Sequence, residues 1–181
     1  MRELSLHIID VIENGITAGA DLITLKISED RKNNLLTIVI TDNGSGIPEN
    51  ILETVMDPFF TTKTTRRVGL GLSLFREASK RCNGEFKIRS REGEGTKISA
   101  SFQLDHIDMV PVGDMARSLS CLIMGNPEVD FLYFHEVDGQ SFNIDTRHIR
   151  DELDGIPLNN IEVINYITRT ISESLEKIIH E

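Results

Sequence analysis

This chain of 181 residues has no tryptophan, only two cysteines and no apolar stretch near the roughly 20 residues that span a bilayer. Cys82 and Cys121 lack the spacing of metal ligands, and they suit small buried residues in a reducing cytoplasm. Glu3, His7 and Asp10 interrupt the N-terminal segment where a signal peptide needs continuous apolar residues. These absences predict a folded cytoplasmic protein without a membrane partner.

An excess of basic residues is also missing, because the formal net charge is −10. Residues 1–104 hold 14 Lys or Arg and 14 Asp or Glu, whereas residues 105–181 hold 5 and 15. The second segment therefore carries the whole net charge. This shift predicts a neutral domain over 1–104 and an acidic C-terminal α/β subdomain of unknown role over 105–181.

Within the neutral segment, residues 57–81 form a local basic patch, with six Lys or Arg against two acidic residues. A basic patch in an acidic protein favours a small polyanion, such as a phosphate chain. Nucleic acid is disfavoured as a partner, because the electrostatic attraction that dominates such binding is missing overall.

The order of helical and strand patterns in the first segment predicts an α+β fold. Helical spacing of apolar residues alternates with short β-rich runs that flank turns. The expected elements are a helix over 3–18, strands over 23–28 and 35–41, a helix after Pro48, a helix over about 72–82 and strands over 86–91 and 97–104. Helices between hairpins predict a two-layer α/β sandwich with the helices on one face of the sheet.

The acidic segment has patterns of its own and predicts a small folded α/β extension. Asp114 suits the N-cap of a helix that ends at Gly125, and Asp138-Gly139 is a strong hairpin turn between two strands. Helices are expected over about 146–153 and 160–178, the latter with an apolar stripe. We expect this stripe to cover the core of the segment rather than to contact a partner.

Asp10 and Asn14 lie one helical turn apart, so their side chains project the same way. An amide oxygen can complete the shell of Mg²⁺, which keeps phosphate oxygens and waters as further ligands. The neighbouring carboxylate can accept a proton from an attacking hydroxyl or water. Alone, the pair also fits a solvated helix face. His7, on the same stripe, suits a surface or hydrogen-bonded histidine better than a catalytic one.

Two glycine-containing motifs complete the candidate site. In DNGSGI (42–47), a carboxylate that ends an apolar strand can accept a purine amine, and the glycines let the backbone approach a flat ring. In GLGLS (69–73), the glycines precede a helix whose free amides suit phosphate oxygens. Each motif alone also fits an ordinary turn or loop. The second is not a P-loop, because Gly-Lys-Ser/Thr is absent.

Five motifs, D-x-x-x-N, DNGSGI, DPFFTTK, GLGLS and GEGT, occur in this order over residues 4–102. Together they resemble the GHKL superfamily, which includes gyrase, the heat-shock chaperone ATPase, histidine kinases and a mismatch-repair ATPase. ENGITAGA is similar to the mismatch-repair helix, and DPFFTTK with GLGLS is similar to histidine kinases. The overall layout resembles small stand-alone histidine-kinase-like ATP-binding proteins, and the anti-sigma Ser/Thr kinases are another stand-alone precedent. The resemblance implies the Bergerat fold, with ATP between sheet and helices.

By matching positions, the resemblance implies ATP and Mg²⁺ as cofactors. Asn14 would hold Mg²⁺, Asp42 would accept the adenine amine, and Thr96 would support that aspartate through water. The glycines of DNGSGI would lie at the ring edge, and residues 69–72 would bind phosphates. The expected nucleotide-binding residues are Asn14, Asp42, Gly44, Gly46, Ile47, Thr62, Lys63, Gly69, Leu70, Gly71, Leu72 and Thr96, with Asp10 as the catalytic residue.

Three departures from the family pattern refine the functional expectation. Asp10 stands where ATPases of this superfamily have Glu and many histidine kinases have Asn or His. The lid between Lys63 and Gly69 is very short, and no helical pair with a phosphoacceptor histidine precedes the ATP helix. We therefore expect a stand-alone Mg-ATP-binding regulator that transfers phosphate to a partner protein. The alternatives are an ATPase switch and a nucleotide-sensing module without catalysis.

Overall fold

The strands of the computed structural model, which describes residues 3–52, 54 and 70–180, form one six-stranded mixed sheet in the order β3-β4-β2-β1-β5-β6. The strands are β1 (Leu22–Asp30), β2 (Leu35–Asp42), β3 (Phe86–Arg91), β4 (Gly95–Gln103), β5 (Asp130–Val137) and β6 (Gln140–Asp145). The helices are α1 (Leu4–Thr17), α2 (Glu49–Leu52), α3 (Leu70–Arg81), α4 (Met115–Gly125), α5 (Thr146–Glu152) and α6 (Ile161–His180). The predicted α+β sandwich is confirmed.

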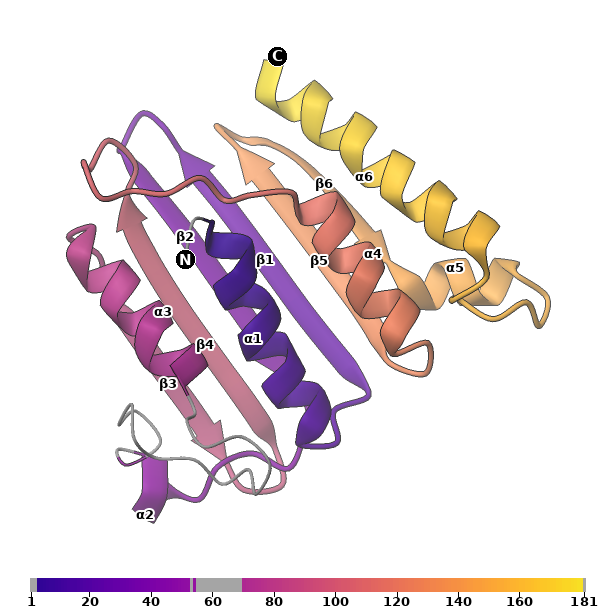
Figure 1. Cartoon of the computed structure of the whole chain (residues 1–181), viewed down its shortest axis with the longest axis horizontal. Coiled ribbons are helices and arrows are strands. Elements are labelled where there is room, and N and C mark those ends of the chain that lie inside the picture. Colours follow the sequence, from indigo (N-terminus) through magenta and orange to yellow (C-terminus); the bar gives the residue numbers. More distant parts are fainter. Residues whose placement is uncertain (1–2, 53, 55–69, 181) are drawn as a thin grey trace.

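The main helices cover one face of this sheet. In Figure 1, α1, α3 and α4 lie across the near face, and α6 runs beside α4. Alternate strand residues point toward the helices, as Ile23, Leu25 and Ile27 of β1 show by their burial. On the helix side, Ile8 and Phe75 are fully buried. The core therefore lies between one sheet face and one helix layer.

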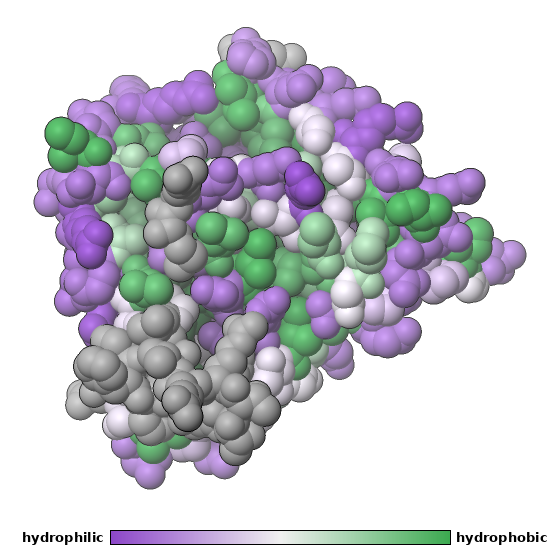
Figure 2. All heavy atoms as spheres, in the orientation of Figure 1, coloured by the Kyte–Doolittle hydropathy of each residue, from purple (hydrophilic) through white to green (hydrophobic). Residues whose placement is uncertain are grey.

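The outer surface of the helix layer is mixed in character. Figure 2 shows hydrophilic residues around most of the rim and hydrophobic residues toward the middle, over α1 and α4. Leu6 of α1 and Met124 of α4 are among the exposed large hydrophobic residues. Of the helices in the described part of the chain, none combines the length and apolar character needed to cross a bilayer.

The acidic C-terminal segment contributes two strands to the same sheet. β1 pairs with β2 in antiparallel fashion on one side and with β5 in parallel fashion on the other. β6 then pairs with β5 as the last strand of the sheet. The division near residue 104 thus falls within one continuous sheet, and it stays a prediction about domain organisation.

Local signals in this segment act as the sequence predicts. The Asp114 side chain caps α4 by accepting from the Arg117 backbone N–H at 2.9 Å. Asp138 and Gly139 both have positive φ, 51° and 90°, which suits the two-residue turn of a tight hairpin.

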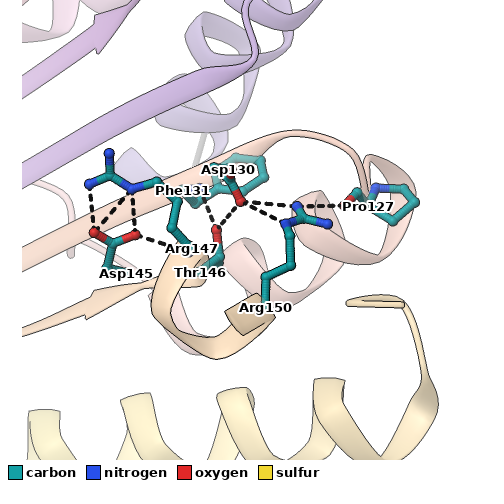
Figure 3. Close-up of polar contacts among 7 residues, drawn as sticks. All are labelled: Pro127, Asp130, Phe131, Asp145, Thr146, Arg147 and Arg150. Carbon is teal, nitrogen blue, oxygen red and sulfur yellow. Dashed lines mark hydrogen bonds and ion pairs between the residues drawn. The ribbon is translucent and has the colours of Figure 1, made fainter. Parts of the chain in front are cut away.

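A polar cluster fastens α5 to the start of β5 (Figure 3). The hydroxyl of Thr146, which is fully buried, accepts from the Phe131 backbone N–H at 2.8 Å and donates to Asp130 at 3.1 Å. Arg150 of α5 donates to the same carboxylate at 2.9 Å. These bonds fold the turn after β6 back onto the sheet.

Candidate nucleotide site

The candidate site lies where β2 ends and β4 begins, beneath the C-terminal half of α1. Asp42 and Thr96 are directly opposite each other in the register of these two strands. Their side chains share the helix-facing side of the sheet with the buried residues Ile40 and Ile98. The Asp42 carboxyl group is therefore directed between the sheet and the helix layer.

Gly15 makes this arrangement possible. A Cβ atom at this position would lie 2.8 Å from the Asp42 Cβ and 3.2 Å from its Oδ2 atom. Real Cβ atoms do not approach other heavy atoms so closely, so α1 can pack at this depth only because residue 15 has no side chain. The glycine directly follows Asn14, and its role was not assigned from the sequence.

The Asp42 carboxylate is half-buried and hydrogen-bonded. Its Oδ1 atom accepts from the Gly44 backbone N–H at 3.0 Å. Burial raises the pKa of Asp42, while hydrogen bonds from the Gly44 and Thr96 backbones act in the opposite direction. The site thus presents a preorganised acceptor in a partly desolvated position.

The loop after Asp42 is a fixed connection to α1, and it does not form the hairpin turn that its Asn-Gly sequence also allowed. The Asn43 side chain accepts from the backbone N–H groups of Asp21 and Leu22 at 3.1 and 3.0 Å. The Ser45 backbone N–H donates to the Ala18 carbonyl at 2.9 Å. These bonds fasten the motif to the start of β1 on one side and to the end of α1 on the other.

Ser90 joins the same loop to the β3–β4 hairpin. Its hydroxyl accepts from the Ile47 backbone N–H at 2.8 Å and lies 2.8 Å from the Thr96 hydroxyl. Gly46, at φ 67°, packs so closely on the Arg91 carbonyl that no side chain would fit. Sequence reasoning missed Ser90, whose signal was a polar residue at an inward-facing position of a strand that alternates Phe86, Ile88, Ser90.

The first turn of α3 meets α1 at Asp10. A Cβ atom on Gly71 would lie 3.0 Å from the Asp10 Cβ, so the glycine motif and the N-terminal helix are in direct contact. Asp10 and Asn14 are both partly exposed, one turn apart on α1. Leu72 is 8% exposed and packs in the core, which leaves only its backbone for a ligand.

The structure brings together most of the predicted residues that it describes. Asp10, Asn14, Asp42, Gly44, Gly46, Ile47, Gly71 and Thr96 border one region between α1, α3 and the sheet. Leu70 begins α3, so its backbone lies at the same helix end. Thr62, Lys63 and Gly69 lie outside the described residues, as does the segment DPFFTTK. Among the residues described, no three His, Cys, Asp or Glu side chains group as metal ligands.

The prediction that His7 could lie at the surface is wrong. The side chain is 5% exposed, and its ring stacks on Phe75 of α3 with centroids 5.6 Å apart. Its Nδ1 atom is buried and has no hydrogen-bond partner among the described residues. Helical periodicity placed His7 on the stripe of Asp10, but α3 covers that end of the stripe.

The comparison with protein families identifies the fold around this site. The model for the histidine kinase-, DNA gyrase B- and HSP90-like ATPases matches residues 2–106. This chain belongs to that family. The matched residues include every candidate position from Asp10 to Thr96. The predicted GHKL membership is thereby confirmed.

Curated members of this ATPase family are much longer than the chain. A putative sensor protein of Shewanella frigidimarina is 33% identical over 113 residues, which are 59% of this chain and 17% of that protein. Sporulation kinase C of Bacillus subtilis is 33% identical over 95 residues, 52% of this chain and 22% of that kinase. The chain spans less than a quarter of either relative. Its ATP-binding domain is of the histidine kinase type.

A solved structure of the family extends the likeness in fold. The ATPase domain of MutL from Aquifex aeolicus, complexed with ADP, superposes with a TM-score of 0.56 at 17% identity. The superposition covers 80% of this chain and 63% of that domain. This share is larger than residues 2–106, so the shared fold includes part of the acidic segment.

His7 predicts a pH dependence of stability. Burial lowers the pKa of His7 from 6.5 to about 4, so the folded state binds fewer protons than the unfolded state between these values. The contribution of neutral His7 to the free energy of unfolding is therefore fully present above pH 6.5 and is lost as the pH falls toward 4. The loss should be roughly 1–3 kcal/mol, because one pKa unit corresponds to about 1.4 kcal/mol.

Urea unfolding of the parent and of His7→Phe at several pH values between 4 and 7 tests this. The variant keeps a ring against Phe75 and should lose much of the slope. His180→Gln, at an exposed position, is the control and should retain it. Equal slopes in the parent and in His7→Phe would contradict the assignment.

Proposed function

We propose that this chain is a Mg-ATP-binding regulator of the histidine kinase type that transfers phosphate to a partner protein. The observation that carries the proposal is the contact of Gly15 with Asp42, because it joins the predicted metal-binding helix to the predicted adenine acceptor. Family membership and the kinase relatives favour phosphotransfer. The partner protein and the transfer itself are part of the proposal.

The residues at the inner end of the site suit adenine. Asp42 accepts the exocyclic amine, and Gly44 and Gly46 let the loop backbone pack against Ala18 and Arg91, which holds the loop beside the aspartate. Thr96 supports the aspartate from β4, directly opposite in the register. A guanine base carries an oxygen at the corresponding ring position, which a carboxylate acceptor rejects.

The phosphate end lies between α1 and α3. Asn14 supplies an amide oxygen for Mg²⁺, which typically takes few protein ligands and several phosphate or water oxygens. When bound, the metal neutralises charge on the phosphate chain. The backbone amides at the start of α3, residues 70–72, donate to phosphate oxygens where Gly71 lies against Asp10. Asp10 accepts the proton of the attacking nucleophile.

Asp42→Asn separates nucleotide binding from stability. Burial raises the pKa of Asp42, so its ionised form disfavours folding and this penalty persists above the folded pKa. We expect the ligand-free variant to melt at pH 7 no lower than the parent. The melting temperature should nevertheless rise much less with Mg-ATP, because a hydrogen bond to a charged group contributes about 1.5–3 kcal/mol. A parent protein that GTP stabilises as much as ATP would refute the adenine assignment.

Asp10 and Asn14 should separate by experiment. Asn14→Ala should remove metal-dependent nucleotide binding and all activity together. Asp10→Asn keeps size and polarity but cannot accept a proton, so Mg-ATP affinity should survive while the phosphate-releasing rate falls roughly 10²–10⁴-fold. Glu13→Gln, an exposed position on the same helix, is the matched control and should behave like the parent.

The readout is γ-labelled ATP incubated with the purified chain, alone and with protein extract from its source cells. Label on a protein that disappears with Asp10→Asn supports phosphotransfer. Free phosphate alone would instead indicate an ATPase switch. Binding without either product would leave a nucleotide-sensing module as the function, and an unchanged rate in Asp10→Asn would remove the base assignment.

A further inference from the structure

The sheet face opposite the helices carries a group of basic residues, mainly on β3 and β4, although Asp30 of β1 and Glu136 of β5 share that face. The strand register assigns this face to the residues that alternate with the buried ones. Five of them are basic and exposed, from β1, β3 and β4: Lys26, Lys87, Arg89, Arg91 and Lys97. We call these five residues the basic sheet face.

Two of these charges lie directly against each other. Arg89 of β3 and Lys97 of β4 are opposite in the antiparallel register, so their side chains project together. Like charges in directly opposite positions destabilise a sheet. Neither residue has an ion-pair partner among the described residues, and the same holds for Lys26, whereas Lys87 and Arg91 pair with nearby glutamates.

Protection against aggregation explains only part of this arrangement. β3 is an edge strand, where lysine and arginine discourage pairing with other chains. β4 and β1 are interior strands with both neighbours in place, so Lys97 and Lys26 have no such role. The charge of Lys97 therefore opposes stability, through its position opposite Arg89, without protecting an edge.

Partly buried apolar and hydroxyl side chains accompany the charges. Lys26 lies between Val39 of β2 and Phe134 of β5 in one cross-strand row, and both neighbours are partly exposed. Thr37 and Thr41 flank Val39 on the same face. Apolar anchors within a charged and polar surround are typical of a protein–protein interface.

We propose that the basic sheet face docks an acidic surface of a partner protein. Charge complementarity selects an acidic partner, and the apolar row around Lys26 favours a protein over a phosphodiester chain. A net charge of −10 also opposes nucleic acid, whose binding depends on long-range attraction. Asp42 faces the other side of the sheet, so the docked partner leaves the nucleotide site open.

The test uses the full chain with a labelled poly-L-glutamate peptide, and binding is followed by fluorescence anisotropy at low ionic strength. The double variant Arg89→Glu/Lys97→Glu should weaken binding roughly tenfold or more. The matched control Arg117→Glu/Lys177→Glu makes the same change in net charge at exposed positions of α4 and α6. It should weaken binding less than about twofold, and the thermal shift with Mg-ATP should be unchanged in both.

Other outcomes overturn the proposal. Equal weakening by both pairs would mean that net charge alone governs binding. Tighter binding of a single-stranded DNA of equal charge would make this a nucleic-acid face. Self-association in sedimentation that the first pair of substitutions abolishes would make the occupant a second copy.

The single variant Lys97→Thr tells loss of binding apart from loss of folding. It should weaken peptide binding while raising the melting temperature by about 1–3 °C, because it relieves the like-charge pair. A lower melting temperature would contradict a charge retained for binding.

Discussion

The close approach of α1 to the end of β2 is the constraint on which the site depends. A helix can lie this near a carboxylate only where it has no Cβ, and Gly15 supplies that gap. Gly71 repeats the device between α3 and Asp10. Gly15 therefore sets the depth of α1 on the sheet, and Gly71 sets the distance between α3 and α1. These two contacts position the residues that we propose as base, metal ligand and adenine acceptor.

The site retains a group that burial disfavours. The pKa of Asp42 is raised because its carboxyl group is partly desolvated, and hydrogen bonds from Gly44 and Thr96 only oppose this effect. The loop that carries this carboxylate is held by hydrogen bonds between neutral groups: the Ser45 backbone N–H donates to the Ala18 carbonyl, and the Ile47 backbone N–H donates to the Ser90 hydroxyl. Such a preorganised acceptor is useful only if a ligand donates to it, which supports the proposal of a nucleotide amine there.

Local patterns predicted the elements of this fold well. The helical stripe of α1, the Asp114 cap and the Asp138-Gly139 turn all specify structure within a few residues. The motifs also indicated which residues would form the site, since family members share their order along the chain. What the sequence did not show depends on contacts between distant segments.

The pairing of β5 with β1, about one hundred residues apart, joins the acidic segment to the first sheet. Neither periodicity nor charge specifies such a register. His7 was misplaced for the same reason, because only the position of α3 decides that Phe75 covers its ring. Ser90 became visible only when β3 and the loop after Asp42 were brought together.

The most direct test of this account is the affinity of Mg-ATP for Gly15→Ala, measured by isothermal titration calorimetry. Alanine favours a helix interior over glycine by about 1 kcal/mol, so loss of binding cannot be attributed to a weaker helix. Gly125→Ala is the control, because a Cβ atom there meets nothing within 4 Å. The account predicts parent-like affinity for Gly125→Ala and a loss of roughly tenfold or more for a folded Gly15→Ala. Unchanged affinity in Gly15→Ala would contradict it.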